Sequence, residues 1–446
     1  MARSGLRRIG IFGGGTVGGG IVEILRRKQT VLRSLCLSDC GLIISKICVR
    51  DPNKPRDFVI PEGCSIVTDY DAILSDPAID VVVEVMGGVD EARGVVFESL
   101  RAGKDVVTAN KALIAKYLPE IDALVQEVNA ARERPVEFRY EAAVCGGIPV
   151  IRSLLNDFVG DDVTMLAGIV NGCTNFVLTG MERDGWSYEE SLARAAELGY
   201  AESDPALDVG GFDARSKLRI LMRLAFGLDV DENEIAARGI RDLTKDDFEY
   251  ARMLGGTIKI MGVARTPPSE TGTREVSAYV SPVYVAADDA FAHVSYATNA
   301  VEIVSENLQA TTLTGQGAGR YPTANSCVND ILALARGDST APLPFGPKNE
   351  EARFVNDFTS QFYVRLNYSD TFGIVRQCGE ICEECGVGIH SLLQNPVSDK
   401  SNATFVMVTD NVPASAIKRV AARLEALSWC KGQVFHMPVL REGTIK

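Results

Sequence analysis

The sequence predicts an α/β protein in three parts: a parallel, doubly wound sheet, a mixed α+β middle and a C-terminal ferredoxin-like domain. Three observations lead to this prediction. Continuous apolar segments at 80–85 and 105–108 are typical of strands buried on both faces of a parallel sheet. The proline- and glycine-rich segment 337–347 is typical of an interdomain linker. Beyond it, strand and helix patterns follow the β-α-β-β-α-β order of a ferredoxin-like domain.

Composition narrows the range of functions. The chain has 446 residues, 46% hydrophobic and 24% charged, as expected for a soluble protein with several domains. Its net charge of -13 argues against nucleic acid or an anionic membrane as a general partner. No apolar segment approaches the roughly 20 residues that span a bilayer, and the N-terminus leads into a strand without a signal peptide. We expect a cytoplasmic protein; organellar import of a longer precursor stays open.

The first predicted strand, at 8–12, runs directly into a glycine-rich turn and a helix. Gly13, Gly15 and Gly18 fit G-x-G-x-x-G in this strand–turn–helix setting. The first glycine permits a tight turn, the second lets a pyrophosphate approach the backbone, and the third lets the helix pack closely. The phosphates would lie at the helix N-terminus, beside Thr16 and Val17. The motif predicts a Rossmann-type dinucleotide-binding domain.

The next predicted strand, at 42–49, ends in Arg50 and Asp51, with Lys54 close by. An acidic residue there typically holds the ribose hydroxyls of NAD, whereas an arginine can bind the 2'-phosphate of NADP. Both cofactors stay open, and Arg50 favours NADP. The long spacing from the glycine motif indicates an extended first helix.

A predicted helix at 212–227 carries an unusual lysine. Lys217 shares an apolar stripe with leucines at three- and four-residue spacing, namely Leu221, Leu224 and Leu228. Burial would lower the pKa of Lys217 toward the range useful for proton transfer, and Asp213 lies one turn earlier on the same face. The alternative is a solvated ion pair of no functional importance.

Several other predicted elements carry candidate residues. Lys111 follows the strand at 105–108, and ligands bind beyond strand C-termini in such sheets; the alternative is an ordinary surface lysine. A further strand is expected at 137–144, and the segments 165–170, 275–285 and 301–306 are expected to form a second sheet. A glycine turn at 315–321 should precede a helix at 324–336.

The cysteines and histidines do not indicate a nucleophile or a metal site. Cys173 lies in a loop similar to the nucleophile loop of phosphorylating aldehyde dehydrogenases, which need a histidine beside the thiolate. No histidine precedes His293, so we expect a packing role for Cys173. Cys378, Cys382 and Cys385 have the spacing of a radical-enzyme cluster ligand set, but the same spacing is one face of a helix, and we favour the helix.

Taken together, these motifs resemble one family, homoserine dehydrogenase, along nearly the whole chain. The tail resembles an ACT regulatory domain, and no aspartate kinase domain precedes the glycine motif, so the resemblance is to monofunctional members. The matching segments are 13–18, 84–88, 108–111, 141–144, 171–175, 199–205, 213–217 and 321–324.

The resemblance implies NAD(P)-dependent interconversion of L-aspartate 4-semialdehyde and L-homoserine, in threonine and methionine biosynthesis. Lys217 would donate the proton and Lys111 would assist. The residues implied to bind substrate are Glu202, Asp208, Asp213 and Gly199. Those implied to bind the cofactor are Gly13, Gly15, Thr16, Val17, Gly18, Arg50, Met86, Gly87, Lys111, Gly199 and Gly319.

The resemblance also implies a sodium ion, held mostly by main-chain oxygens of Glu141, Val144, Gly146 and Ile148, a donor set that suits a hard cation. It implies a homodimer or homotetramer, with threonine as an effector of the ACT-like domain. The chain departs from the family at Cys173, where threonine is common. It departs again at Phe372, where the ACT pattern usually has proline, so threonine control stays open.

The expected domains are a dinucleotide-binding domain at 1–140, to which 320–337 returns, and a substrate-binding, catalytic and dimerisation domain at 141–319. A linker at 338–357 and the ACT-like domain at 358–446 follow. Two other functions compete with the enzyme. A sensor without turnover would be expected to lack the lysines or carboxylates, and a phosphorylating semialdehyde dehydrogenase would need a cysteine–histidine pair.

Overall fold

The computed structural model describes residues 7–35, 41–201, 204–267, 274–338, 344–397, 399–441 and 445. The chain divides into two compact units. The first unit comprises Met1–Leu166, Ser216–Glu232 and Val301–Ala352; the second comprises Ala167–Arg215, Asn233–Ala300 and Arg353–Lys446. None of the helices in the described ranges combines the length and apolar character that crossing a membrane requires.

The first unit contains a six-stranded sheet in the order β3-β2-β1-β4-β5-β6, with every neighbouring pair parallel. This is the strand order of a Rossmann fold, and the predicted fold class is confirmed. Its strands are β1 (Arg7–Phe12), β2 (Leu42–Cys48), β3 (Ser65–Val67), β4 (Val81–Glu84), β5 (Asp105–Thr108) and β6 (Phe138–Arg139). Its helices are α1 (Thr16–Leu35), α2 (Asp71–Leu74), α3 (Asp90–Arg101), α4 (Lys111–Ala130), α5 (Val150–Asn156) and α11 (Arg320–Arg336), with the 3-10 turn η1 (Glu141–Ala143).

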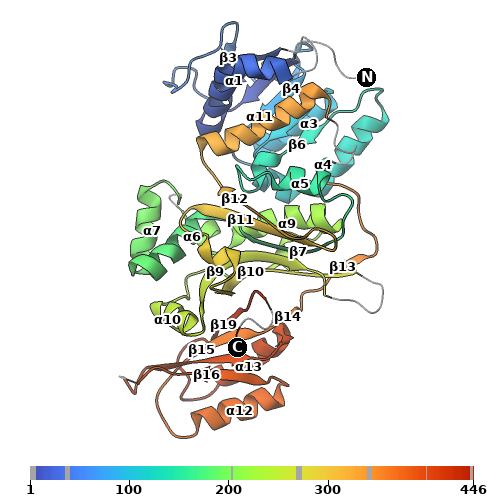
Figure 1. Ribbon diagram of the computed structural model, residues 1–446. Coiled ribbons are helices and arrows are strands. Elements are labelled where there is room, and N and C mark those ends of the chain that lie inside the picture. The colour runs from blue at the N-terminus through green and yellow to red at the C-terminus, as the bar shows by residue number, and fades with distance from the viewer. Residues whose placement is uncertain are drawn as a thin grey trace. The chain divides into compact units, whose positions relative to one another are not determined.

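Helix α11, distant in sequence, packs along α1 in the first unit (Figure 1). Ala324 and Ile331 of α11 share one apolar core with Ile21 and Leu25 of α1. The helices approach closely because Gly20 has no side chain: a Cβ built there would lie 2.9 Å from the Cβ of Ala324. The length of α1, 20 residues, agrees with the extended first helix that the sequence predicted.

The expected strand at 137–144 is wrong beyond its first residues. β6 covers only Phe138–Arg139, and the chain then enters the 3-10 turn η1. Tyr140 leaves the strand conformation, with a φ of -155° and a ψ of 31°, and Glu141–Ala143 form the 3-10 turn. The glycine turn at 315–321 also differs from expectation, because its first two residues end a strand and α11 already begins at Arg320.

The middle of the chain forms a seven-stranded sheet in the order β12-β11-β7-β9-β10-β13, with β8 paired to β10. Strands β9 and β10 form a long antiparallel ladder from Gly256↔Ala286 to Arg265↔Ser277. The predicted strands at 165–170, 275–285 and 301–306 correspond to β7, β10 and β11, whereas β9 and β12 were not predicted. The strands are β7 (Val163–Ile169), β8 (Ala236–Ala237), β9 (Gly256–Arg265), β10 (Arg274–Ala286), β11 (Thr298–Ser305), β12 (Gln309–Gln316) and β13 (Ala352–Phe354).

The middle of the chain also contains helices and helical turns, two of which, α8 and α9, carry Asp208 and Asp213. They are α6 (Gly172–Thr179), the π-helical turn η2 (Gly180–Asp184), α7 (Tyr188–Glu197), α8 (Ala206–Val209), α9 (Phe212–Phe226), η3 (Glu232–Glu234), α10 (Lys245–Met253) and η4 (Ala290–His293).

The C-terminal part has the predicted β-α-β-β-α-β order and an antiparallel sheet in the order β16-β17-β15-β19. This is a ferredoxin-like arrangement. Its elements are β15 (Phe362–Tyr368), α12 (Ile374–Glu384), β16 (Ile389–Leu393), β17 (Ala403–Thr409), α13 (Ala414–Glu425) and β19 (Phe435–Pro438), with β14 (Thr359–Ser360) paired to β18 (Val412–Pro413).

The cysteine triplet lies on α12, as the helix interpretation predicted. Cys378 and Cys382 are buried in the apolar core of this domain, and burial raises the pKa of the two thiols to about 12 and about 11. Within the described part of the chain, no group of three or more His, Cys, Asp or Glu side chains could hold a metal ion. Cys378 and Cys382 are therefore protonated core residues.

A buried ion pair joins this C-terminal domain to α10 inside the second unit. Asp247 on α10 is fully buried and forms an ion pair with Arg365 of β15. The same carboxylate accepts hydrogen bonds from the Tyr363 hydroxyl at 2.9 Å and the Thr244 amide at 2.8 Å. Because both carboxylate oxygens are satisfied, the charge is compensated in a dry environment, and the joint should be stiff.

Candidate active site

The glycine turn after β1 has the geometry that a dinucleotide requires. Gly13 adopts a φ of 112°, and a Cβ there would lie 2.5 Å from the Val85 carbonyl oxygen. A Cβ on Gly18 would collide with the carbonyl oxygen of Gly13, whereas one on Gly15 would meet nothing within 4 Å. Gly13 and Gly18 thus allow the backbone to pack closely. Gly15 leaves open space at the N-terminus of α1, where a pyrophosphate would bind.

The loop after β2 places basic side chains near this turn. Arg50 is exposed. Arg56, which the sequence analysis did not single out, donates hydrogen bonds to the carbonyl oxygens of Asp51 and Lys54, both at 2.8 Å. Its Nε would lie 3.4 Å from a Cβ built on Gly14. Arg56 therefore braces the loop against the glycine turn and fixes the backbone that carries Arg50.

A buried carboxylate organises the ends of β4 and β5. Glu84 is fully buried, and burial raises its pKa. It accepts a hydrogen bond from the Thr108 hydroxyl at 2.6 Å and from the Met86 amide at 3.0 Å. Glu84 was noted only as part of a motif, although a carboxylate ending a continuous apolar strand could have identified it. Its two hydrogen bonds fix the exit turn that contains Met86 and Gly87.

The same network extends to Lys111, the first residue of α4. Asn110 caps this helix by accepting a hydrogen bond from the Leu113 amide at 3.0 Å. Its side-chain amide donates to the Gly88 carbonyl oxygen at 2.7 Å. The turns after two neighbouring strands are thereby linked, so Lys111 projects from a fixed position at the carboxyl edge of the sheet.

Helix α9 buries the lysine that the sequence singled out. Lys217 and Asp213 are each 7% exposed and lie one turn apart. The alternative of a solvated ion pair is therefore wrong. Contrary to the expectation from the sequence, Leu228 does not belong to the apolar stripe of α9, because the helix ends at Phe226. Gly227, with a φ of 66°, ends the helix.

Helices α4 and α9, which carry the two lysines, contact each other in the first unit through two arginine side chains of α9. The Arg219 guanidinium donates a hydrogen bond to the Ala115 carbonyl oxygen, and Arg223 forms a buried ion pair with Asp122 at 3.3 Å. The Arg219–Ala115 contact lies before the kink that α4 makes at Tyr117. Lys111 and Lys217 each lie within about one helical turn of this contact in the sequence.

The second unit brings together two of the expected substrate carboxylates. The side-chain amide nitrogen of Asn171 donates a hydrogen bond to Asp208 at 2.7 Å and to Asp213 at 2.8 Å. Glu202, the third expected carboxylate, lies outside the described residues. Gly199, after α7, has a φ of 76°, a conformation that favours glycine.

Cys173 lies beside this carboxylate pair as a protonated thiol. Burial and the charges of Asp208 and Asp213 raise its pKa to about 12. A nucleophilic cysteine requires a lowered pKa, so the environment supports the expectation that Cys173 is a packing residue.

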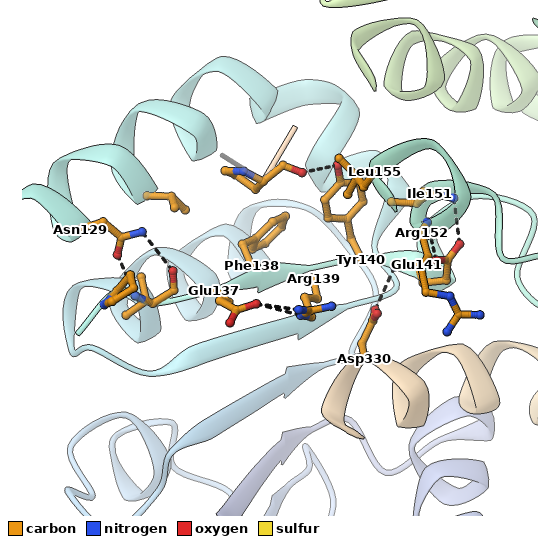
Figure 2. A pocket seen from close by; sticks show the side chains of 14 residues that line it. Asn129, Glu137, Phe138, Arg139, Tyr140, Glu141, Ile151, Arg152, Leu155 and Asp330 are labelled. Atoms are coloured by element: carbon orange, nitrogen blue, oxygen red, sulfur yellow. Dashed lines mark hydrogen bonds and ion pairs between the residues drawn. The ribbon is translucent and has the colours of Figure 1, made fainter. Parts of the chain in front are cut away.

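The expected sodium ligands Glu141, Val144, Gly146 and Ile148 lie in the turn η1 or within a few residues after it, and Figure 2 shows the Glu141 side chain. The Glu141 carboxylate accepts hydrogen bonds from the backbone amides of Ile151 at 3.0 Å and Arg152 at 2.8 Å. Burial and the neighbouring carboxylate of Asp330 raise its pKa to about 7. A cation here would relieve a carboxylate that is costly to ionise.

The main chain of this turn offers oxygen donors of the kind a hard cation prefers. The carbonyl oxygen of Gly146 accepts a hydrogen bond from Ser326 at 2.7 Å, and that of Ile148 from the Val150 amide at 2.8 Å. Each carbonyl oxygen retains a second lone pair, so these residues fit a sodium ion. A cavity of about 100 Å³ next to the turn is lined by Tyr140, Glu141 and other residues of this region.

Comparison with known proteins identifies the family. Residues 13–136 match the family model "Homoserine dehydrogenase, NAD binding domain", and residues 149–332 match the model "Homoserine dehydrogenase". Homoserine dehydrogenases of Bacillus subtilis and Pseudomonas aeruginosa are 35% and 36% identical to this chain. The alignments cover 94% and 97% of this chain and 95% and 98% of those proteins. The crystal structure of a homoserine dehydrogenase from Thiobacillus denitrificans is 31% identical, with a TM-score of 0.88, and covers 98% of this chain and 99% of that one.

Proposed function

The chain belongs to the homoserine dehydrogenase family and is an NAD(P)-dependent oxidoreductase, and from this premise we propose that it interconverts L-aspartate 4-semialdehyde and L-homoserine. The observation that carries the proposal is the contact between α4 and α9 at Ala115 and Arg219, close to which lie Lys111 and the buried Lys217. Such an arrangement suits reduction of a carbonyl group.

Reduction of the aldehyde builds negative charge on its oxygen, and the protein must neutralise that charge. When bound, the nicotinamide supplies the hydride. We assign to Lys217 the delivery of the proton to the oxygen, and to Lys111 the electrostatic stabilisation of the developing charge. Burial of Lys217 strengthens its own interaction with the oxyanion, because an ammonium group interacts more strongly with an anion in a low-dielectric environment.

The substrate's ammonium group requires carboxylates. We assign Asp208, Asp213 and Glu202 to this role because charge-assisted hydrogen bonds to an ammonium group are strong and directional. Gly199 and Gly319, both at positive φ, would allow the backbone to approach the ligands closely. Asp208→Asn should therefore raise the KM for homoserine, and an unchanged KM would contradict this assignment.

The cofactor assignment rests on the glycine turn and the loop after β2. Gly13, Gly15, Thr16, Val17 and Gly18 would hold the pyrophosphate, and Met86 and Gly87 would line the dinucleotide. We propose a preference for NADP because Arg50 is exposed on a loop that Arg56 braces. Equal KM values for NADPH and NADH in the wild type, or an Arg50→Ala variant with unchanged KM for NADPH, would contradict this preference.

We propose that sodium binds at Glu141, Val144, Gly146 and Ile148. The support is the buried carboxylate of Glu141 with its raised pKa and the main-chain oxygens around it. Sodium chloride should then raise the melting temperature more than the same concentration of tetramethylammonium chloride, and Glu141→Gln should remove the difference. Equal melting temperatures in the two salts would rule the site out.

We propose that the C-terminal ferredoxin-like domain, expected at 358–446, acts as an ACT domain that binds threonine. The turn at 370–373 departs from the ACT pattern, and Phe372 in it is fully exposed, so the effector contact would differ from that of the usual proline. Calorimetry with threonine tests this directly; no heat of binding together with a flat activity titration would refute it.

The remaining proposals concern organisation. We propose a dinucleotide-binding domain at 1–140 that includes 320–337, a substrate domain at 141–319 that also forms a homodimer or homotetramer interface, and a linker at 338–357.

We also propose a cytoplasmic location and a place in threonine and methionine biosynthesis. Light scattering coupled to size exclusion tests the oligomer, and a monomer would contradict it.

The decisive experiment follows NADPH absorbance with L-aspartate 4-semialdehyde. Wild type should oxidise NADPH rapidly, and Lys217→Ala should lose most turnover while still binding NADPH. The matched control is Lys116→Ala, since Lys116 is an exposed lysine on α4 paired with Asp90; it should keep turnover. Near wild-type kcat in Lys217→Ala would refute the proton-transfer role. No turnover in any protein, with NADPH binding intact, would favour the sensor alternative, and a strict phosphate requirement would favour the phosphorylating one.

A further inference from the structure

The side-chain amide of Asn171 lies between two carboxylates. One nitrogen donates to the Asp208 carboxylate at 2.7 Å and to the Asp213 carboxylate at 2.8 Å. An asparagine amide has two hydrogens, and both are used here. The two carboxylates come from different elements, α8 and α9, so Asn171 connects the start of α6 to both of these elements.

The orientation of this amide is determined by its other end. The Asn171 oxygen accepts hydrogen bonds from the Thr174 amide at 2.9 Å and the Thr174 hydroxyl at 3.0 Å. Reversing the amide would direct a carbonyl oxygen at two carboxylates and a nitrogen at a backbone donor. The observed orientation is therefore the only one that satisfies all partners.

Helix α6, which begins immediately after Asn171, is anchored at several points. Asn175 donates to the Thr298 carbonyl oxygen at 3.1 Å. Gly172 lets the helix approach the 293–299 segment, because a Cβ there would lie 2.9 Å from the Ala297 carbonyl oxygen. Lys259, on β9, donates to the Val294 carbonyl oxygen of that same segment at 3.0 Å. The N-terminus of α6 is thus a fixed platform.

Two carboxylates held within reach of one nitrogen repel each other unless a donor or cation compensates their charge. A neutral amide compensates only part of the charge and leaves lone pairs on each carboxylate for a further donor. A primary ammonium group, with three hydrogens, is the complementary ligand. A protein cation in place of Asn171 would instead neutralise the pair and remove its attraction for the substrate.

We infer that Asn171 is a positioning residue that holds Asp208 and Asp213 as a preformed receptor for the ammonium group of the amino-acid substrate. The inference rests on the proposed function for the identity of that substrate. Asn171 acts through the two carboxylates, and its loss should weaken amino-acid binding more than it slows turnover.

The test variant is Asn171→Ser, because serine is also a favourable N-cap and keeps the start of α6 while removing the bridging amide. We expect the KM for homoserine to rise about 10-fold or more, as expected for loss of charge-assisted hydrogen bonds. We expect kcat to change less than about 3-fold and the KM for the cofactor to stay at the wild-type value. Asn171→Asp, which keeps shape and cap but adds a negative charge, should raise the KM for homoserine as well.

A double-mutant cycle separates this role from simple destabilisation. Asp208→Asn alone should raise the KM for homoserine, and adding Asn171→Ser should then cost much less than it does in the wild type, because coupled residues are not additive. The control is Ser187→Ala, which removes the cap of α7 and should lower stability without changing either KM.

The outcomes distinguish the inference from the proposed function. Failure of the wild type to turn over homoserine would refute the proposed function. An active wild type with a homoserine KM in Asn171→Ser within 2-fold of the wild-type value would refute the positioning role alone, as would strictly additive effects in the cycle. If Asn171→Ser does not fold, Asn171→Asp carries the same test.

Discussion

Gly15→Ala should separate cofactor binding from folding. In the protein, a Cβ on Gly15 meets nothing within 4 Å, so the substitution creates no clash. Alanine is a poorer N-cap than glycine for α1, but it also lowers the entropy of the unfolded chain; these opposing effects should leave the free energy of unfolding within about 1 kcal/mol of the wild-type value. The added methyl group occupies the space where the pyrophosphate would approach the backbone. We expect the NADPH Kd to rise at least about 10-fold, or roughly 1.4 kcal/mol.

Two further glycine variants are matched controls for this prediction. Gly18→Ala would place a methyl group against the Gly13 carbonyl oxygen, so it should lose about 1–3 kcal/mol of stability as well as NADPH affinity. Gly94→Ala, on an exposed position of α3 with nothing within 4 Å, should gain about 1 kcal/mol and keep the wild-type Kd.

The assays are fluorescence titration with NADPH for the Kd and urea unfolding for stability, on all four proteins. A Gly15→Ala protein with wild-type Kd would mean that the pyrophosphate does not approach this turn, and the dinucleotide assignment of residues 13–18 would be wrong. A Gly15→Ala protein that loses several kcal/mol of stability would contradict the geometric argument instead.

Two other predictions concern buried charges. Burial lowers the pKa of Lys259 from 10.5 to about 8, so the native state releases this proton at lower pH than the unfolded chain does. The free energy of unfolding should therefore rise between about pH 8 and 10.5, by up to about 3 kcal/mol; Lys259→Met should flatten this rise in urea titrations, and parallel wild-type and variant curves would contradict it. Arg365→Met would leave the buried Asp247 without its cation and should lower the free energy of unfolding by about 3–5 kcal/mol. A loss below about 1 kcal/mol would mean that the joint between α10 and β15 is not stiff.

The sequence determined those parts of the fold that depend on local patterns. The continuous apolar strands, the glycine turn and the β-α-β-β-α-β tail each follow from spacing within a few residues, and the structure has them. The strand expected at 137–144 failed because its apolar pattern is also compatible with a buried 3-10 turn. The turn is set by contacts distant in sequence, such as the hydrogen bond from the Glu141 amide to Asp330 at 3.0 Å, which no local pattern reveals.

The same limit applies to the site. Lys217 was identifiable because a lysine on an apolar stripe is unusual in itself, and the structure buries it. Asn171 and Glu84 were not identifiable in this way, because each acts through a hydrogen-bond partner distant in the sequence. The partner of Asn171 is 37 positions away and that of Glu84 is 24 positions away. An asparagine before a helix is an ordinary cap, and only the structure shows that its other group bridges two carboxylates.

Cys173 lies in a loop similar to the nucleophile loop of phosphorylating aldehyde dehydrogenases, and its surroundings decide whether it can act as a nucleophile. A phosphorylating dehydrogenase must form a thiolate at this position. Here burial, together with the charges of Asp208 and Asp213, raises the pKa of the Cys173 thiol to about 12, so the thiol is protonated at neutral pH. The two carboxylates that we propose to bind the substrate ammonium group therefore add to the effect of burial and disfavour a cysteine nucleophile. A carboxylate pair that would bind an ammonium group and a thiolate nucleophile are incompatible neighbours, and this chain has the carboxylate pair.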